Sequence, residues 1–223
     1  MEIIEVRPEL RMFRFLVGAA YLWRDGDELT LIDTGPVGQT ELIESALDGD
    51  LRRIVLTHWH EDHTGSAAEL ARRHDVEVIA HRLEAPVIRG ERIGAPPVLE
   101  EFEIPIIESV PRLPPAPPCR VDREVEDGDV LDFGGGAVVV AVPGHTDGSI
   151  ALHLPGPGLL FTGDTVANVG RTILGVFNTD RARAIGSLRT MAALEPDTVL
   201  VGHGDPVVGR GAAALREAVA EVS

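Results

Sequence analysis

The most constraining feature of this 223-residue sequence is a set of five histidines and two aspartates that stand where hydrophobic segments end. Four of them form one cluster, and the other three follow at long intervals, each beside a glycine. Glycine lets the backbone turn sharply and brings the next side chain close to a crowded centre. These positions restrict the fold, because a strand is expected to end at each of them. The residues are His58, His60, Asp62, His63, His145, Asp164 and His203.

The spacing within the first cluster favours metal binding. In an extended segment residues i and i+2 project to one side, so His58 and His60 are placed to bind one ion together. Asp62 and His63 lie beyond the turn and suit a second ion. Histidine and carboxylate ligands without cysteine favour zinc, and they also fit iron or manganese. The competing interpretation is a run of surface histidines that binds no metal.

Hydrophobic periodicity predicts alternating strands and helices in both halves of the chain. The first half has a hairpin around Asp25-Gly26, and a capping box of Ser66 and Glu69 is expected to begin a helix. In the second half, Pro196 is expected to end a long helix. Predicted strands cover residues 20–24, 29–33, 53–57, 76–80, 130–133, 137–142, 150–154, 159–162 and 198–201, and helices cover 42–47, 181–194 and about 212–219.

Strands followed by helices in each half suit two sheets packed face to face with helices outside. The length fits a single domain that spans residues 1–223. A connection over about 86–118 holds nine of the 16 prolines, a density that long helices and central strands do not tolerate. This connection is expected to be a lid or a strap between the two halves.

The charge and the cysteine count restrict the partners and the location. A net charge of −16 repels phosphate backbones, so nucleic acid is not an expected partner. All 20 basic residues are arginine, which excludes a lysine Schiff base. The longest apolar run, residues 15–23, is about half of a membrane span, and no signal peptide is evident. We expect a soluble cytoplasmic protein with a small-molecule substrate and no internal disulfide, since Cys119 is alone. The oligomeric state is left open.

The sequence resembles the metallo-β-lactamase superfamily. The motif H-x-H-x-D-H, followed by His, Asp and His after successive strands, matches from residues 31–35 to 202–204. The resemblance implies a four-layer αβ/βα sandwich of two mixed sheets. It also implies that Asp33 supports the ligands from behind and that Asp164 bridges two ions. By the same resemblance, His58, His60 and His145 hold the first ion, and Asp62, His63 and His203 hold the second.

Such a ligand set implies a dinuclear metal-dependent hydrolase. Two divalent ions share a water and lower its pKa toward ~7, so that a bridging hydroxide attacks a carbonyl. Asp62 is the expected catalytic residue, because it can both bind metal and orient the hydroxide. The expected substrate is a small ester, thioester or lactone, and the two ions are expected to be Zn²⁺, with iron or manganese as alternatives.

Other branches of the superfamily fit less well. True lactamases lack the bridging aspartate at Asp164, flavodiiron relatives carry Glu at the position of His60, and the nucleases have insertions or exosites. Only 20 residues follow His203, so the helical domain of glyoxalase II enzymes is expected to be absent. Acyl-homoserine lactonases carry Tyr where this chain has Ala167. The small generic hydrolases of the superfamily, which are similar to glyoxalase II, remain.

Two alternatives from other classes stay open. The first is a mononuclear iron enzyme similar to persulfide dioxygenases, with a facial triad of His58, His145 and Asp164. The sequence Gly170-Arg171-Thr172 resembles theirs. The second is a metal-binding module without catalysis. For the hydrolase, the proline-rich connection and the segment after Asp164 are expected to line the substrate pocket. The candidate pocket residues are Phe102, Ile106, Leu113, Arg171 and Phe177.

Overall fold

The computed structural model describes residues 2–222, which divide into two compact units. The first unit contains residues 2–94 and Leu113–Val125. The second contains Ala95–Arg112 and residues 126–222. The segment Ala95–Arg112, called the strap segment below, therefore belongs to the second unit although it lies between two parts of the first. The prediction of a single domain over 1–223 stays a prediction.

The first unit is built on a seven-stranded mixed sheet whose strands follow their sequence order. Neighbouring strands from β1 to β4 are antiparallel, and those from β4 to β7 are parallel. The parallel strands end at the same edge, where the first ligand cluster follows β5. The strands are β1 (Glu2–Arg7), β2 (Leu10–Arg14), β3 (Ala19–Asp25), β4 (Glu28–Ile32), β5 (Asp50–Leu56), β6 (Glu77–His81) and β7 (Arg123–Val125).

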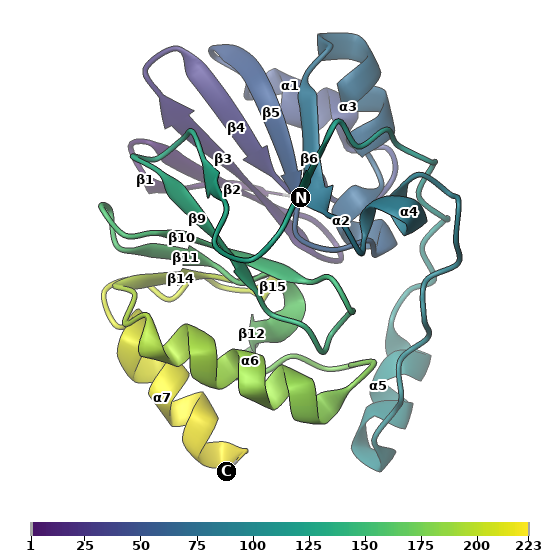
Figure 1. The fold of residues 1–223 in the computed structure, drawn as a ribbon, viewed down its shortest axis with the longest axis vertical. Coiled ribbons are helices and arrows are strands. Elements are labelled where there is room, and N and C mark those ends of the chain that lie inside the picture. Colours follow the sequence, from purple (N-terminus) through teal and green to yellow (C-terminus); the bar gives the residue numbers. More distant parts are fainter. Residues whose placement is uncertain (1, 223) are drawn as a thin grey trace. The chain divides into compact units, whose positions relative to one another are not determined.

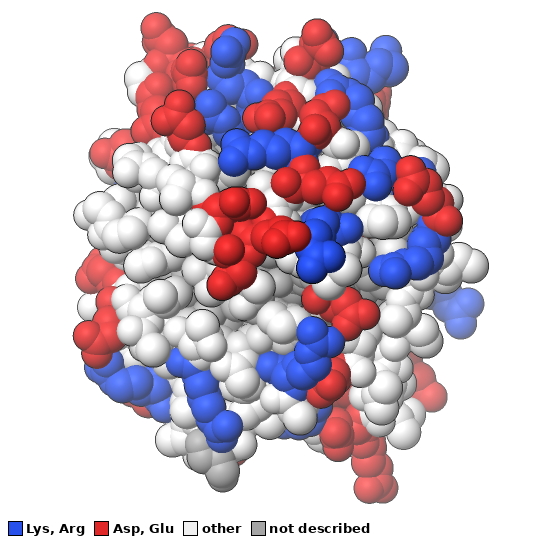
Figure 2. Space-filling view, in the orientation of Figure 1, with Lys and Arg blue, Asp and Glu red and all other residues white. Residues whose placement is uncertain are grey.

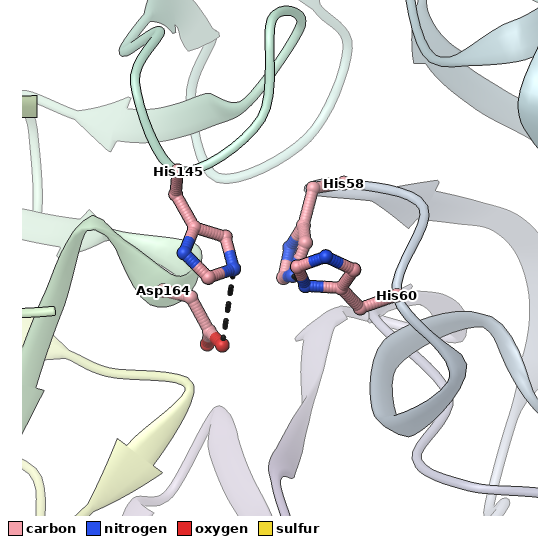
Figure 3. Close-up of side chains that lie close together, drawn as sticks. All are labelled: His58, His60, His145 and Asp164. Atoms are coloured by element: carbon pink, nitrogen blue, oxygen red, sulfur yellow. Dashed lines mark hydrogen bonds and ion pairs between the residues drawn. The ribbon is translucent and has the colours of Figure 1, made fainter. Parts of the chain in front are cut away.

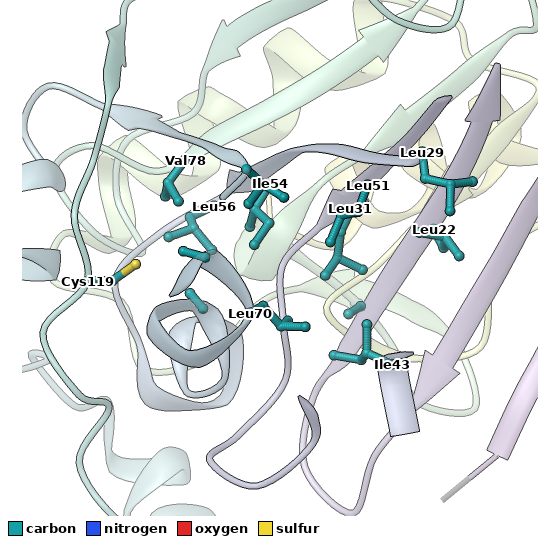
Figure 4. Close-up of a cluster of buried hydrophobic side chains, with 14 of the residues drawn as sticks. Leu22, Leu29, Leu31, Ile43, Leu51, Ile54, Leu56, Leu70, Val78 and Cys119 are labelled. Atoms are coloured by element: carbon teal, nitrogen blue, oxygen red, sulfur yellow. The ribbon is translucent and has the colours of Figure 1, made fainter. Parts of the chain in front are cut away.

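Helices cover one face of this sheet and bury an aliphatic core. The helices are α1 (Thr40–Ser45), α2 (Glu61–Thr64), α3 (Ala67–His74) and α4 (Ala85–Ile88). Ile43 of α1 and Leu70 of α3 pack against strand residues such as Leu31 and Ile54, and Cys119 closes the cluster (Figure 4). Each such side chain contributes about 1.5–3 kcal/mol by leaving water. This burial anchors the strand ends that carry the ligands.

The second unit has a five-stranded sheet in the order β14-β11-β10-β9-β8 and a three-stranded sheet in the order β13-β12-β15. Figure 1 shows α6 and α7 side by side in this unit, and both contribute to its core with β9, β10, β11 and β14. The strands are β8 (Val130–Leu131), β9 (Ala137–Ala141), β10 (Ile150–Leu154), β11 (Leu159–Phe161), β12 (Val166–Asn168), β13 (Thr172–Leu174), β14 (Thr198–Leu200) and β15 (His203–Gly204). The helices are η1 (Glu101–Glu103), α5 (Ile104–Ser109), η2 (Gly163–Thr165), α6 (Arg181–Ala193) and α7 (Gly211–Glu221).

Most predicted elements are confirmed, but one local prediction is wrong. Ser66 and Glu69 form no capping box, because Ser66 has no side-chain cap bond at the start of α3. Its hydroxyl instead donates to the Pro36 carbonyl and accepts from the Gln39 N–H. Glu69 accepts from Thr40 and pairs with Arg73. Tertiary contacts with the 36–39 loop therefore replace the local cap.

Acidic and arginine side chains are intermingled on the face drawn in Figure 2. In the first unit, Arg73 pairs with Glu44 at 2.7 Å and Arg89 pairs with Glu124 at 2.9 Å. Within residues 2–222, no helix combines the length and the hydrophobicity needed to cross a membrane.

Candidate metal ligands

Four of the predicted ligands lie together in the first unit, directly after β5. The chain leaves the strand at Leu56, extends through His58 and His60, and turns into the short helix α2. Nε2 of His58 lies 3.0 Å from Nδ1 of His60. Nε2 of His63 lies 3.5 Å from Oδ2 of Asp62. Donor atoms this close to one another are expected of ligands that share an ion, since each metal–nitrogen bond is about 2 Å long.

The carboxylate of Asp33 holds this cluster from behind. Asp33 follows β4 and is buried. It accepts two hydrogen bonds from Thr57, from the N–H to Oδ1 and from the hydroxyl to Oδ2, both at 2.8 Å. Oδ2 also lies 2.8 Å from Nδ1 of His63. A carboxylate on the far nitrogen of an imidazole is the usual arrangement behind a metal-binding histidine.

These hydrogen bonds fix which ring nitrogens are available for metal. An ionised Asp33 only accepts, so Nδ1 of His63 carries the proton and Nε2 keeps a lone pair. The one hydroxyl hydrogen of Thr57 is donated to Asp33. The hydroxyl oxygen lies 3.0 Å from Nδ1 of His58 and therefore accepts a hydrogen bond from this nitrogen. Nε2 of His58 is then the nitrogen available for metal. The Asp33 carboxylate thus determines which nitrogen carries the proton in both imidazoles, directly in His63 and through Thr57 in His58.

The backbone around the first cluster is tightly constrained. Asp33 has a φ of 58°, in the left-handed region that is uncommon for a residue with a side chain. Gly18 has a φ of 77°, and a Cβ there would lie 2.9 Å from the carbonyl oxygen of Asp62. The buried carboxylate of Glu84 accepts a hydrogen bond of 2.9 Å from the N–H of Trp59. The segment between the two histidines is thereby held from outside the motif.

The other three predicted ligands lie together in the second unit. Asp164 lies in η2, directly after β11, and His203 is in β15, which pairs with β12. Oδ2 of Asp164 is 3.0 Å from Nε2 of His203 and 3.6 Å from Nε2 of His145 (dashed line in Figure 3). Figure 3 also draws His58 and His60, which belong to the first unit. One carboxylate oxygen that faces two imidazoles suits a ligand shared by two ions.

Residues 175–180 hold the backbone on both sides of this group. The N–H of Thr179 donates to the carbonyl of His145 at 3.2 Å, and the N–H of Asp180 donates to Gly144 at 2.9 Å. The N–H of Gly175 donates to Thr165 at 3.0 Å, next to Asp164. A Cβ at position 175 would fall only 1.8 Å from the carbonyl oxygen of Asp164, so this position requires glycine.

The predicted pocket residues have different surroundings. Phe102 is exposed beneath Arg181, whose guanidinium lies 5.6 Å from the ring centroid. Ile106 is exposed on α5, and Leu113 is half-buried in the first unit. The N–H of Phe177 is bonded to Glu103. Arg171 pairs with Glu221 of α7 at 2.6 Å. Their role in a pocket stays a prediction, and Arg171 already has a partner elsewhere in its unit.

Three supporting residues are absent from the sequence-based assignment. Thr57 directly precedes the first ligand, so its position directly after β5 is a usable signal. Glu84 and Glu103 are buried carboxylates that accept backbone N–H bonds from segments distant in sequence. Nothing in their local sequence marks them, because each contact depends on tertiary structure.

The fold and the donor sets define a metal-binding α/β protein. Residues 14–203 match the family model described as the metallo-beta-lactamase superfamily, and the chain belongs to this family. The predicted fold class is thereby confirmed. Two solved structures support it: a metallo-β-lactamase family protein from Thermus thermophilus (TM-score 0.70, 22% identity, 97% of this chain and 80% of that one) and a metallo-β-lactamase from Pontibacter korlensis (TM-score 0.73, 18% identity, 98% and 97%).

Relatives that share more sequence are named as hydrolases. The probable metallo-hydrolase YflN of Bacillus subtilis is 30% identical over 72% of this chain and 67% of its own length. A hydroxyacylglutathione hydrolase of Rhodobacter capsulatus is 31% identical over 82% of this chain and 61% of its own length. The chain thus spans about three fifths of that enzyme. The protein TTHA1623, solved in a di-iron-bound form, is 28% identical, with a TM-score of 0.66 over 88% of this chain and 92% of that one. Two of these relatives are thus hydrolases by name, and one of them is named a metallo-hydrolase.

Proposed function

We propose that the chain binds two divalent metal ions and hydrolyses an ester, thioester or lactone bond of a small molecule. The observation that carries this proposal is the convergence of two imidazoles on one oxygen of Asp164. A shared carboxylate is needed only where two ions lie side by side. The assembled ligand groups would be His58, His60, His145 and Asp164 for one ion, and Asp62, His63, Asp164 and His203 for the other.

The donor chemistry fits divalent transition metals. Neutral imidazoles with few carboxylates leave bound ions strongly Lewis acidic. When bound, the pair would supply a water of lowered pKa and polarise the carbonyl to be attacked. Asp62 would orient this water and accept its proton, because its carboxylate lies beside His63 and is partly exposed. Zn²⁺ is the proposed metal, and the di-iron form of TTHA1623 makes iron the alternative to test.

A thioester is the preferred bond within the proposed substrate class. Hydroxyacylglutathione hydrolases act, by name, on acyl groups joined to glutathione, and a sulfur-linked acyl group is a thioester. Because the chain spans about three fifths of that enzyme, the proposal carries over the type of bond and not the glutathione group.

Metal content and turnover of two variants test this function. Asp164→Ala should lose both ions and more than roughly 100-fold in activity, since it removes a donor from each group. His74→Ala is the matched control, because His74 is on α3 and contacts Glu44. Wild type and control should hold two ions per chain by elemental analysis. One tightly held iron, with no gain on adding zinc, would instead support the persulfide dioxygenase-like alternative.

We also propose that the strap segment forms a wall of the substrate pocket and selects the acyl group, together with Leu113, Arg171 and Phe177. Phe102 and Ile106 expose 53% and 39% of their surface, an apolar area that an acyl chain could cover. Phe102→Ala and Ile106→Ala should change the ratio of KM values for short-chain and long-chain esters. Val130→Ala, at an exposed position of β8, is the control. Equal effects on all esters would indicate a plain connection.

A further inference from the structure

The strap segment is attached to residues 177–181 of the second unit by three contacts. The N–H of Val98 donates to the carbonyl of Asn178 at 2.9 Å. Oε1 of Glu103 accepts from the N–H of Phe177 at 2.9 Å. The Arg181 guanidinium lies over the Phe102 ring. All three contacts fall on the short stretch that leads into α6, so the position of the strap segment depends on this stretch.

The loop of residues 175–180, which overlaps this stretch, supports two predicted metal ligands. The N–H of Gly175 donates to Thr165, next to Asp164, and the N–H of Thr179 donates to the carbonyl of His145. A buried carboxylate in the strap segment is therefore separated from the ligand backbones by one short loop. A shift of this loop would move the carbonyls of His145 and Thr165, and the ligand side chains with them.

Glu103 is the best-buried member of this attachment. Only 1% of this residue is exposed. Both of its carboxylate oxygens accept hydrogen bonds from backbone N–H groups, Oε1 from Phe177 and Oε2 from Glu100. Burial of a carboxylate is costly unless such bonds satisfy it. Phe177 has a φ of 61°, a conformation that a residue with a side chain keeps only when its surroundings hold it there. The bond from Phe177 to Glu103 is one such restraint.

We propose that Glu103 is a positioning residue that couples the strap segment to the metal ligands His145 and Asp164. The coupling rests on the proposed metal-dependent function. With Glu103 in place, docking of the strap segment and correct placement of the two ligands favour each other. By linkage, metal binding then stabilises the docked strap segment by the same factor by which docking tightens metal binding.

The test compares Glu103→Ala, Glu103→Gln and Glu101→Gln in the full chain. Gln keeps the volume and one acceptor oxygen, and Glu101 is an exposed control in the same turn. Zn²⁺ affinity is measured by competition with a chromophoric chelator. Exposure of the strap segment is measured, with and without Zn²⁺, as the rate at which trypsin cleaves after Arg112. Mass spectrometry assigns the cleavage site.

We expect roughly 10-fold weaker Zn²⁺ binding in Glu103→Ala, an intermediate loss in Glu103→Gln and none in Glu101→Gln. Zn²⁺ should slow cleavage at Arg112 in the wild type and the control, and this protection should fall in Glu103→Ala by the factor lost in affinity. The proposal would be overturned if Glu103→Ala only lowered the melting temperature and left both the Zn²⁺ affinity and the Zn²⁺ protection at Arg112 unchanged. If the alanine variant does not fold, the same comparison is made with Glu103→Gln. Failure of the wild type to hydrolyse any ester or thioester would instead count against the proposed function, since neither readout requires turnover.

Discussion

The Asp33 carboxylate lies 2.8 Å from Nδ1 of His63 and, through the Thr57 hydroxyl, also sets the tautomer of His58. Asp33→Asn should therefore weaken metal binding roughly 10–100-fold, because an amide does not hold both imidazoles as the carboxylate does. Asparagine tolerates the left-handed backbone found here, so the change acts on the carboxylate and not on φ. Isothermal titration with Zn²⁺ measures the loss.

Asp132→Asn is the control for this substitution, since it removes an exposed carboxylate in the second unit. It should leave the affinity for Zn²⁺ unchanged. Unaltered affinity in Asp33→Asn, in a protein that remains folded by circular dichroism, would contradict the role assigned to Asp33.

Gly175→Ala should disturb Asp164 without touching its side chain. The new Cβ would fall 1.8 Å from the Asp164 carbonyl oxygen, a distance that forces the backbone apart. We expect a loss of stability of about 1–3 kcal/mol from this overpacking, together with weaker metal binding. Urea unfolding and metal competition measure the two effects.

Gly186→Ala provides a matched comparison, because Gly186 is exposed within α6 and nothing lies within 4 Å of a Cβ built there. Alanine should stabilise this helix by up to about 1 kcal/mol and leave metal binding unchanged. Similar behaviour of the two variants would show that residue 175 has no special relation to Asp164.

Features that depend on local pattern could be predicted from the sequence. The spacing of Ile185, Leu188 and Met191 predicts the helix over 181–194, and α6 covers Arg181–Ala193. The hairpin at Asp25-Gly26 is likewise confirmed by the pairing of β3 with β4. Local pattern is sufficient here because hydrophobic burial selects the same face that the sequence repeats.

Features that depend on distant contacts could not be predicted. The β1–β2 pair was not predicted, because β1 is largely exposed and lacks apolar alternation. The bond from Phe177 to Glu103 spans 74 positions, so neither residue carries a local sign of it. The order of the motifs is sufficient to predict how the candidate ligands are grouped. The hydrogen bonds between Asp33 and Thr57 are seen only in the tertiary structure.

His153 should make the protein less stable in mild acid. Burial in β10 lowers the pKa of His153 below its ordinary value of 6.5. As the pH falls through 6.5, His153 is therefore protonated in the unfolded chain before it is protonated in the folded chain. The free energy of unfolding of the protein decreases as a result. His153→Gln removes this effect. The free energy of unfolding of this variant, relative to that of the wild type, should therefore increase as the pH falls from 8 to 5. Urea titrations at each pH measure this difference. A constant difference across that range would contradict the assignment.

Cys119 should resist thiol reagents in the folded protein. It packs in the core of the first unit, and its N–H donates to the Ile88 carbonyl at 2.9 Å. Burial raises the pKa of Cys119 to about 11. Only on the order of 10⁻³ of the thiol is then ionised at pH 8, and the thiolate is the reactive form.

A surface hollow of about 400 Å³ lies beside Cys119 and is lined by Ala68, Arg72 and Pro118 among others. A reagent can enter this hollow, yet only 3% of the cysteine is exposed there. Labelling with a disulfide reagent at pH 8 should therefore be slow in buffer and fast in urea, with Cys119→Ala as the unlabelled control. Rapid, complete labelling of the folded protein would mean that residues around 118–120 leave the core readily, and that this edge of the first unit opens independently of global unfolding.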